Sequence, residues 1–324
     1  MKKTKIVCAL GAALVLSGCG NAYANISHGS DVVAKIGDVT ITDGDLYPQM
    51  KESSGTEYTL TMIRQKIYEN EIEVTDEMKK KAEEEYESNA KQYEATYSTD
   101  MEDYIKMMGY TDKEEYIEKV ILPNIEQTEL NKKYFAENTE DIMKEYKPAK
   151  ARIFETTDLD KASQALEKLQ DGEDFESVTE KYGDTTTYDG SEKFVYEGSG
   201  LASVVLTKLN EQTKQNTLIN EVIADSTNGK YYVVYLISNE YDTIKDDINE
   251  TLAADSTVTS DVMVYYLKKY NFTVYDTDVF NTLKSNYPQY LVQDPEISDT
   301  DSHNNEKHPL SQADAFFSRL FLLQ

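Results

Sequence analysis

Apolar and polar positions follow one another with two different periods along this chain. Between residues 76 and 97, apolar side chains recur every three or four positions, which predicts one amphipathic helix. The apolar positions are Met78, Ala82, Tyr86, Ala90, Tyr93 and Tyr97. Residues 32–41 instead predict a strand that is interrupted by a turn at Gly37-Asp38. From residue 42 to 146 the pattern is helical, and we expect a kink or break at Pro123.

After Pro148 the period changes repeatedly, which predicts a small α+β unit of about 90 residues, the size of a small domain. The predicted strands are 149–156, 192–196, 221–225 and 231–238, and the predicted helices are 160–171, 174–181 and 201–209. Asn228-Gly229 is a strong hairpin signal between the last two strands. Residues 244–270 return to a helical pattern. A short strand at 272–275 and a helix at 278–287 follow.

Two short β-rich runs lie far apart in the sequence but resemble each other. Residues 39–41 are followed by Thr-Asp-Gly-Asp, and residues 272–274 by Tyr-Asp-Thr-Asp. We expect these two runs to pair and so to join the two ends of the helical region.

The first residues have the order of an export signal. Three lysines precede an apolar run from Ile6 to Leu16, which is too short to span a bilayer. Leu16-Ser17-Gly18-Cys19 then resembles a bacterial lipobox, in which Cys19 is lipidated and becomes the mature N-terminus. Cleavage after Ala24, in Ala22-Tyr23-Ala24, is the alternative.

Charge and composition exclude several classes of function. The net charge is −27, and removing residues 1–18 takes away three lysines and no acid, which leaves −30. So acidic a chain is not expected to bind nucleic acid, nor to adhere by its charge to an anionic membrane, and lipid would be the tether. With three histidines and two cysteines, we expect neither a His- or Cys-rich metal site nor a disulfide framework.

The order of these segments resembles the PrsA-type foldase lipoproteins of Gram-positive bacteria, which carry a parvulin-type peptidyl-prolyl isomerase domain. The resemblance covers nearly all of residues 1–291 and is most specific in KASQALEKLQDGEDFESVTEKYGD, from Lys161 to Asp184. It implies an α+β protein: a mostly helical, discontinuous chaperone domain with an inserted parvulin-like domain. The implied segments are a signal peptide (1–18), a lipidated linker (19–31), two chaperone halves (32–147 and 241–291), the parvulin-like domain (149–240) and a tail (292–324).

The same resemblance points to three site positions that differ from the family pattern. Arg152 stands where the family has a histidine on the first strand, and Tyr232, or Tyr231 in a shifted alignment, where it has one on the last strand. Asp184 corresponds to a third polar position. Because His28, His303 and His308 are the only histidines, no alignment restores either family histidine. We therefore expect weak or absent isomerase activity, with no confident catalytic residue; whether the protein is an enzyme stays open.

The implied function is assistance to the folding of secreted proteins at the outer face of the cytoplasmic membrane, without a cofactor. The expected partners are unfolded or partly folded secreted proteins, and the membrane through the lipid on Cys19. Client segments would be held between the helical and parvulin-like domains. The alternatives are an active peptidyl-prolyl isomerase and a surface lipoprotein that binds a ligand or a wall component. The sequence leaves the oligomeric state open.

The tail combines two contrasting compositions. Residues 292–308 are polar and acidic, which predicts disorder. The chain then finishes with apolar side chains whose partner the sequence does not name; they are Phe316, Phe317, Leu320, Phe321, Leu322 and Leu323.

Overall fold

The computed structural model describes residues 28–184 and 187–293. The described residues form two compact units, and each is treated by itself below. Unit 1 comprises residues 28–60 and 272–293, and unit 2 comprises residues 61–271. The helix α1, Asp43–Glu71, begins in unit 1 and ends in unit 2. The predicted segment boundaries, which divide the chain differently, stay a prediction.

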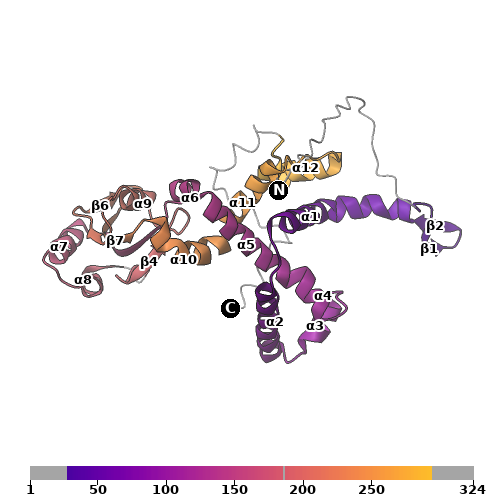
Figure 1. Cartoon of the computed structure of the whole chain (residues 1–324), viewed down its shortest axis with the longest axis horizontal. Coiled ribbons are helices and arrows are strands. Elements are labelled where there is room, and N and C mark those ends of the chain that lie inside the picture. Colours follow the sequence, from indigo (N-terminus) through magenta and orange to yellow (C-terminus); the bar gives the residue numbers. More distant parts are fainter. Residues whose placement is uncertain (1–27, 185–186, 294–324) are drawn as a thin grey trace, which may run out of the picture. The chain divides into compact units, whose positions relative to one another are not determined.

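Unit 1 contains a two-stranded hairpin, the first half of α1 and a C-terminal helix (Figure 1). Its other elements are β1 Val32–Ile36, β2 Val39–Thr42, α12 Thr277–Asn286 and the 3-10 turn Pro288–Tyr290. The Lys51 amine reaches Asp276 at 3.0 Å and Asp278 at 2.8 Å, and the Tyr287 hydroxyl donates to Glu57 at 2.9 Å. These contacts fasten residues 276–287 along the middle of α1.

The hairpin corrects one expectation from the sequence. Strand β2 pairs antiparallel with β1, with Ile36 opposite Val39 and Gly37 at a φ of +57° in the turn. Residues 272–275 form no strand, so the expected pairing between 39–41 and 272–274 does not occur. A two-residue turn brings β1 and β2 together at far smaller entropic cost than a partner more than 200 residues away.

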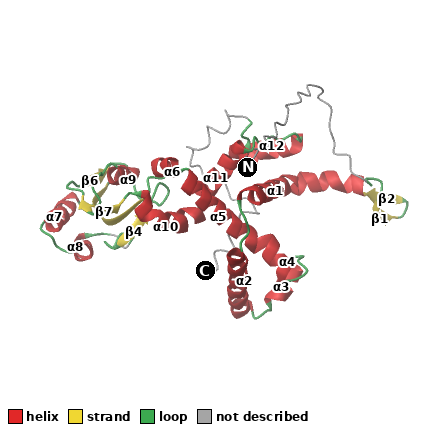
Figure 2. Cartoon of the chain, viewed as in Figure 1, coloured by secondary structure: helices red, strands yellow, loops and turns green. Residues whose placement is uncertain are grey.

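The helical part of unit 2 contains most of the helices seen in red in Figure 2. They are α2 Asp76–Tyr97, α3 Met101–Met107, α4 Lys113–Tyr116, α5 Leu122–Glu137, α6 Thr139–Glu145, α10 Tyr241–Thr251 and α11 Ser256–Lys269. The predicted stripe on α2 is confirmed for its first half, because Met78, Ala82 and Tyr86 are buried in a core with α3 and α4. Ala90 and Tyr93 are only partly buried, and Tyr97 is exposed.

Two details of these helices differ from the sequence expectations. Pro123 causes no break: helical backbone continues from α4 through a π-helical turn, Ile117–Ile121, into α5, and the turn lies just before the proline. The helix predicted at 244–270 is instead two helices separated by a 3-10 turn, Leu252–Ala254. Asp255 caps the second one by accepting from the Thr257 amide at 2.8 Å.

A buried polar network holds α5 against α11. The fully buried Asn131 amide donates to the Ala253 carbonyl at 2.9 Å and to the Thr259 hydroxyl at 3.0 Å. Its oxygen accepts from Gln127, and Gln127 accepts from the Tyr68 hydroxyl at 2.6 Å. Because buried amides are costly when unpaired, this network ties residues from before and after the β-sheet into one arrangement.

A five-stranded antiparallel sheet lies between these helical segments of the sequence. Its strand order is β4-β3-β7-β5, and β6 also pairs with β7. The strands are β3 Ala149–Thr156, β4 Glu192–Val195, β5 Thr217–Leu218, β6 Ile223–Asp225 and β7 Lys230–Ser238, and the helices around them are α7 Leu159–Gln170, α8 Phe175–Tyr182 and α9 Ser203–Asn210. Each element predicted between 149 and 238 is present within a few residues.

Apolar side chains cover both faces of this sheet. On one face, Ile153 and Val234 are buried with Leu206 and Leu209 of α9. On the other face, Phe154 and Val233 are buried with α7 and α8. Since successive side chains of a strand point to opposite faces, these two cores assign a face to every residue of β3 and β7. No helix within the described ranges is long and apolar enough to cross a membrane.

Candidate functional site

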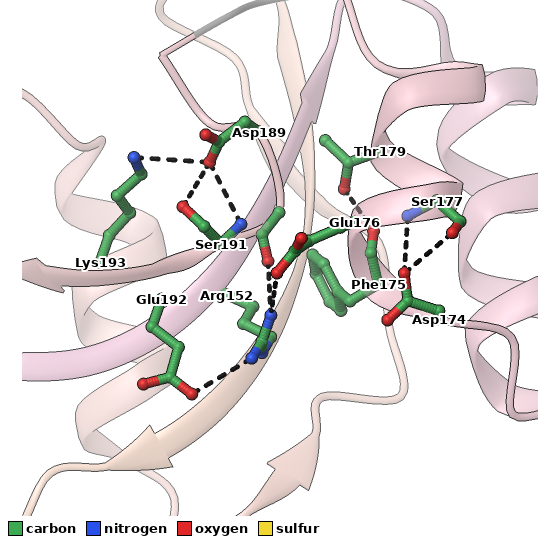
Figure 3. A network of polar contacts seen from close by, with 11 residues as sticks. Arg152, Asp174, Phe175, Glu176, Ser177, Thr179, Asp189, Ser191, Glu192 and Lys193 are labelled. Carbon is green, nitrogen blue, oxygen red and sulfur yellow. Dashed lines mark hydrogen bonds and ion pairs between the residues drawn. The ribbon is translucent and has the colours of Figure 1, made fainter.

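Arg152 links three elements at one edge of the sheet (Figure 3). Its guanidinium donates to Glu176 of α8 at 2.9 Å and to the Gly190 carbonyl at 3.1 Å. A third hydrogen bond, at 3.2 Å, goes to Glu192 of β4. Three of the five guanidinium N–H groups therefore donate to two carboxylates and a backbone oxygen, which is the arrangement of a structural tie.

The turn that meets Arg152 leaves no space for a side chain. Gly190 has a φ of +85°, and a Cβ there would lie 2.8 Å from the Thr179 hydroxyl and 2.9 Å from the Glu176 Cα. The turn before β4 is further fixed by Asp189, whose carboxylate accepts from the amide and hydroxyl of Ser191. Glycine is thus needed here so that the turn can approach α8 and present its carbonyl to Arg152.

Asp184 lies at the end of α8 and binds the end of β3. One oxygen accepts from the Thr156 hydroxyl at 2.6 Å and from the Thr157 amide at 3.1 Å, and the other from Lys161 at 2.8 Å. The hydrogen bond from Lys161, followed by those from Thr156 and Thr157, holds the pKa of Asp184 well below its usual range. This carboxylate is therefore an ionised anchor between β3, α7 and α8.

Tyr232 is buried in the core of the face that packs on α9. It stands directly opposite Glu155 in the strand register, and Glu155 is buried as well. Burial, then a hydrogen bond to Glu155, raises the pKa of Tyr232. Glu155 also accepts from Lys230 at 2.9 Å. Sequence reasoning missed Glu155; the available signal was that it is the only acid in β3 and follows the apolar pair Ile153 and Phe154.

The three positions identified from the resemblance do not converge on one pocket. Arg152 lies between Ala151 and Ile153, which belong to the α9 face, so its own side chain is on the α7–α8 face. Tyr232 is on the α9 face. Tyr231 shares a face with Arg152, but the register places it opposite Thr156, four residues from Arg152, which is about 13 Å along the strand. Their assignment as site positions stays a prediction.

A second constellation, at the end of α1 in unit 2, was also missed by sequence reasoning. The Glu71 carboxylate is 5% exposed and accepts from Lys133 of α5 at 2.6 Å and from the Tyr270 hydroxyl at 2.7 Å. Lys269 of α11 pairs with it as well. Burial alone would raise the pKa of Glu71, but the hydrogen bonds from Lys133, Lys269 and Tyr270 outweigh it and lower the pKa to about 2.

Glu71 also lines a groove of about 720 Å³ between α2, α5 and α10. Ile72, Met78 and Ile125 supply apolar lining, and Lys81, Lys132 and Lys245 are among the charged residues around it. The lining is mixed in sign and mostly charged. Charged side chains of both signs in this lining can pair with one another across the helix junction. A site for an apolar ligand would instead be lined mainly by apolar side chains.

Two further kinds of site were considered from the sequence: a metal site and a site of lipid attachment. Within residues 28–184 and 187–293, no group of three or more His, Cys, Asp or Glu side chains is positioned to hold a metal ion. Cys19, the predicted lipid attachment site, lies outside the described residues.

Comparisons with known proteins agree with the resemblance seen in the motifs. The chain is 28% identical to "Foldase protein PrsA 2" of Bacillus cereus over 294 residues, which cover 88% of this chain and 97% of the relative. It is 27% identical to "Foldase protein PrsA" of Enterococcus faecalis, over 89% of this chain and 87% of the relative. No family model matches the sequence.

A solved structure described as peptidylprolyl isomerase (PrsA) from Bacillus cereus matches 79% of this chain and 98% of its own, with 20% identity and a TM-score of 0.46. That overlap is too loose to support an argument about the site. The similarity rests on the sequence relatives, because they align along most of both chains. Along most of its length this chain is therefore similar to proteins named PrsA foldases, and its own fold is α+β and mostly helical.

Proposed function

We propose that this protein assists the folding of secreted proteins by holding unfolded or partly folded segments, with prolyl isomerase activity weak or lost. The aligned relatives are named foldases, which supports the first part. The second part rests on one observation: Arg152, at the family histidine position, is bound by two carboxylates and a carbonyl on the face opposite Tyr232.

The chemistry of isomerisation explains why this placement matters. Rotation about an X–Pro bond breaks no covalent bond, and its barrier comes from amide resonance. A catalyst must bind the twisted amide in a shaped, desolvated pocket. A guanidinium held by two carboxylates and a carbonyl supplies no apolar surface for a proline ring.

The location and layout of the protein are part of the same proposal. Lipid on Cys19 would hold the protein at the outer face of the cytoplasmic membrane, with the chain from residue 32 onward exposed to emerging clients. The residues 149–240 would form the parvulin-like domain, and 32–147 with 241–291 the chaperone domain. The hydrogen bonds of Asn131 to Ala253 and Thr259 support a joint fold of the two chaperone halves.

The test combines two assays on residues 20–324. The first follows a proline-limited refolding phase, which takes about 10–100 s at 25 °C without a catalyst. The second follows aggregation of several unrelated unfolded proteins. We expect an unchanged rate of the slow phase and reduced aggregation of more than one client.

An active parvulin is the positive control for the first assay, and an acidic protein of similar charge without chaperone activity is the control for the second. A clear acceleration of the slow phase would favour the active isomerase instead. Failure to suppress aggregation of any client would contradict the holding function and favour a ligand-binding lipoprotein.

A further inference from the structure

The hairpin in unit 1 has one apolar face and one polar face. The register places Ala34 opposite Ile41 and Ile36 opposite Val39, so these four side chains share a face. Lys35 and Thr40, which are also opposite each other, lie on the other face, where a register shift also places Val32 opposite Thr42. Such alternation is typical of an antiparallel sheet that packs one face on a core.

No such core covers the apolar face in the described part of the chain. Ile36 is 75% exposed, Val39 62% and Ile41 43%. In the first turns of α1, Leu46, Tyr47 and Met50 are also exposed. The main-chain bonds from Asp43 to Asp31 and from Gly44 to Gly29 hold the hairpin to the start of α1.

We infer that the apolar segment Phe316–Leu323 of the same chain docks on this face. The segment contains six large apolar side chains, and Arg319 is its only charged residue. The hairpin and its flanks carry Asp31, Asp38, Asp43 and Asp45 against Lys35. An acid-free segment with one arginine is therefore complementary to the face in both polarity and charge.

The same charges disfavour two other occupants. A second copy of the hairpin would bring four acids against four acids, and an anionic membrane would also be repelled. A second hairpin and an anionic membrane would each be repelled by the acids of this hairpin, whereas Arg319 would be attracted to them.

The linker between the two partners has the right length. Residues 288–293 follow Tyr287, which is hydrogen bonded to Glu57 in the middle of α1. From Glu57 back to Asp43 is about 21 Å along the helix. The 22 residues from 294 to 315 have a root-mean-square span of about 25 Å as a flexible chain. A linker that matches the distance gives a millimolar effective concentration, so weak contacts suffice.

Docking of this segment has a consequence for the function. It would occupy exposed apolar surface that an unfolded client could otherwise contact, and a client would have to displace it. This consequence, unlike the docking itself, rests on the proposed holding function.

The test measures how fast a thiol on the face reacts. Residues 20–324 contain no cysteine, so Val39→Cys introduces a single thiol whose alkylation can be followed. With a docked segment of about 0.1 mM intrinsic affinity, alkylation should be about tenfold slower than in a chain that also carries Phe316→Ser, Phe317→Ser, Leu320→Ser and Phe321→Ser. Thr40→Cys on the polar face is the matched control and should react equally fast in both chains.

A free peptide of residues 311–324 should restore the protection of Val39→Cys in the substituted chain. Equal alkylation of Val39→Cys in both chains would overturn the inference, and so would protection that rises with protein concentration and survives the four substitutions. Client aggregation is measured on the same chains. If neither chain suppresses it, the holding function fails while the alkylation rates still decide the docking.

Discussion

The five-stranded sheet of unit 2 and the hairpin of unit 1 are both antiparallel, but only the larger sheet has its apolar side chains covered. Leu236 of β7 is fully buried, and the sheet carries a core on each face. Ile36 of β1 shows an equally clear apolar position, yet three quarters of its side chain is exposed. The difference teaches that alternation along a strand specifies an apolar face without specifying what covers it.

A matched pair of truncations tests this comparison with the largest expected effect. Leu236→Ala should lower the free energy of unfolding by about 2–5 kcal/mol, because it leaves a cavity in a closed core. Ile36→Ala should change it by less than about 1.5 kcal/mol, since no described residue buries its side chain and the tenfold docking inferred above is worth about 1.4 kcal/mol. Urea denaturation of the two variants measures both values.

Equal losses in the two variants would contradict the comparison, because they would mean that the hairpin face is firmly covered in solution. Lys35→Ala, on the polar face of the same strand, is the control for any effect of disturbing the hairpin itself.

Lowering the pH should destabilise unit 2, which contains the five-stranded sheet, because Glu71 loses its charge. The folded-state pKa of Glu71 is about 2, below the usual 4.5 of a glutamate, so its stabilisation is present above about pH 4.5 and is lost as the pH falls toward 2. The loss should reach at most about 3 kcal/mol. In Glu71→Gln the midpoint temperature should fall less steeply between pH 5 and pH 2 than in the unaltered chain.

Thermal unfolding followed by circular dichroism at several pH values gives this slope. Glu77→Gln, at an exposed position in the first turn of α2, is the control. Identical slopes for the chain with and without Glu71 would show that this carboxylate is not ionised and paired in the folded state.

The smallest effect is expected at the edge of the covered sheet. Arg152→Ala removes the tie between β3, α8 and β4 and should cost about 1 kcal/mol, because two of its three partners are exposed carboxylates. The prolyl isomerisation rate should not change. Arg152→Lys keeps the charge but not the fork, and should recover only part of the loss.

A rise in isomerase activity in Arg152→Ala would contradict the assignment, since it would mean that the arginine blocks a pocket that is otherwise intact. Lys193→Ala on the neighbouring strand β4 controls for a general loosening of that strand.

The sequence predicted local structure well where local chemistry decides it. Several elements appear within a few residues of their expected bounds. They are the Asn228-Gly229 turn, the helices predicted at 160–171 and 174–181, and the strand predicted at 149–156. The pairing of 39–41 with 272–274 was wrong because two similar β-rich runs carry no information on which partner lies nearer in the folded chain. The break expected at Pro123 does not occur, because the chain passes from α4 into α5 through a π-helical turn just before the proline.

The candidate site could be predicted only in outline. Motifs identified Arg152, Asp184 and Tyr232, but a strand alternates its faces, and an alignment shifted by one residue exchanges Tyr231 for Tyr232 and hence one face for the other. Glu71 gave no signal because its partners, Lys133 and Lys269, are 62 and 198 residues away.

By itself, the sequence determined the fold class, the order of elements, the absence of both family histidines and the resemblance to foldases, because each depends on residue types and on short-range periodicity. Only the tertiary structure decided that Arg152 and Tyr232 lie on opposite faces, that Glu71 is ionised within a helix junction, and that no residue in 28–184 or 187–293 covers one face of the hairpin. These outcomes depend on which distant surfaces meet, and that is set by packing over the whole unit rather than by neighbouring residues.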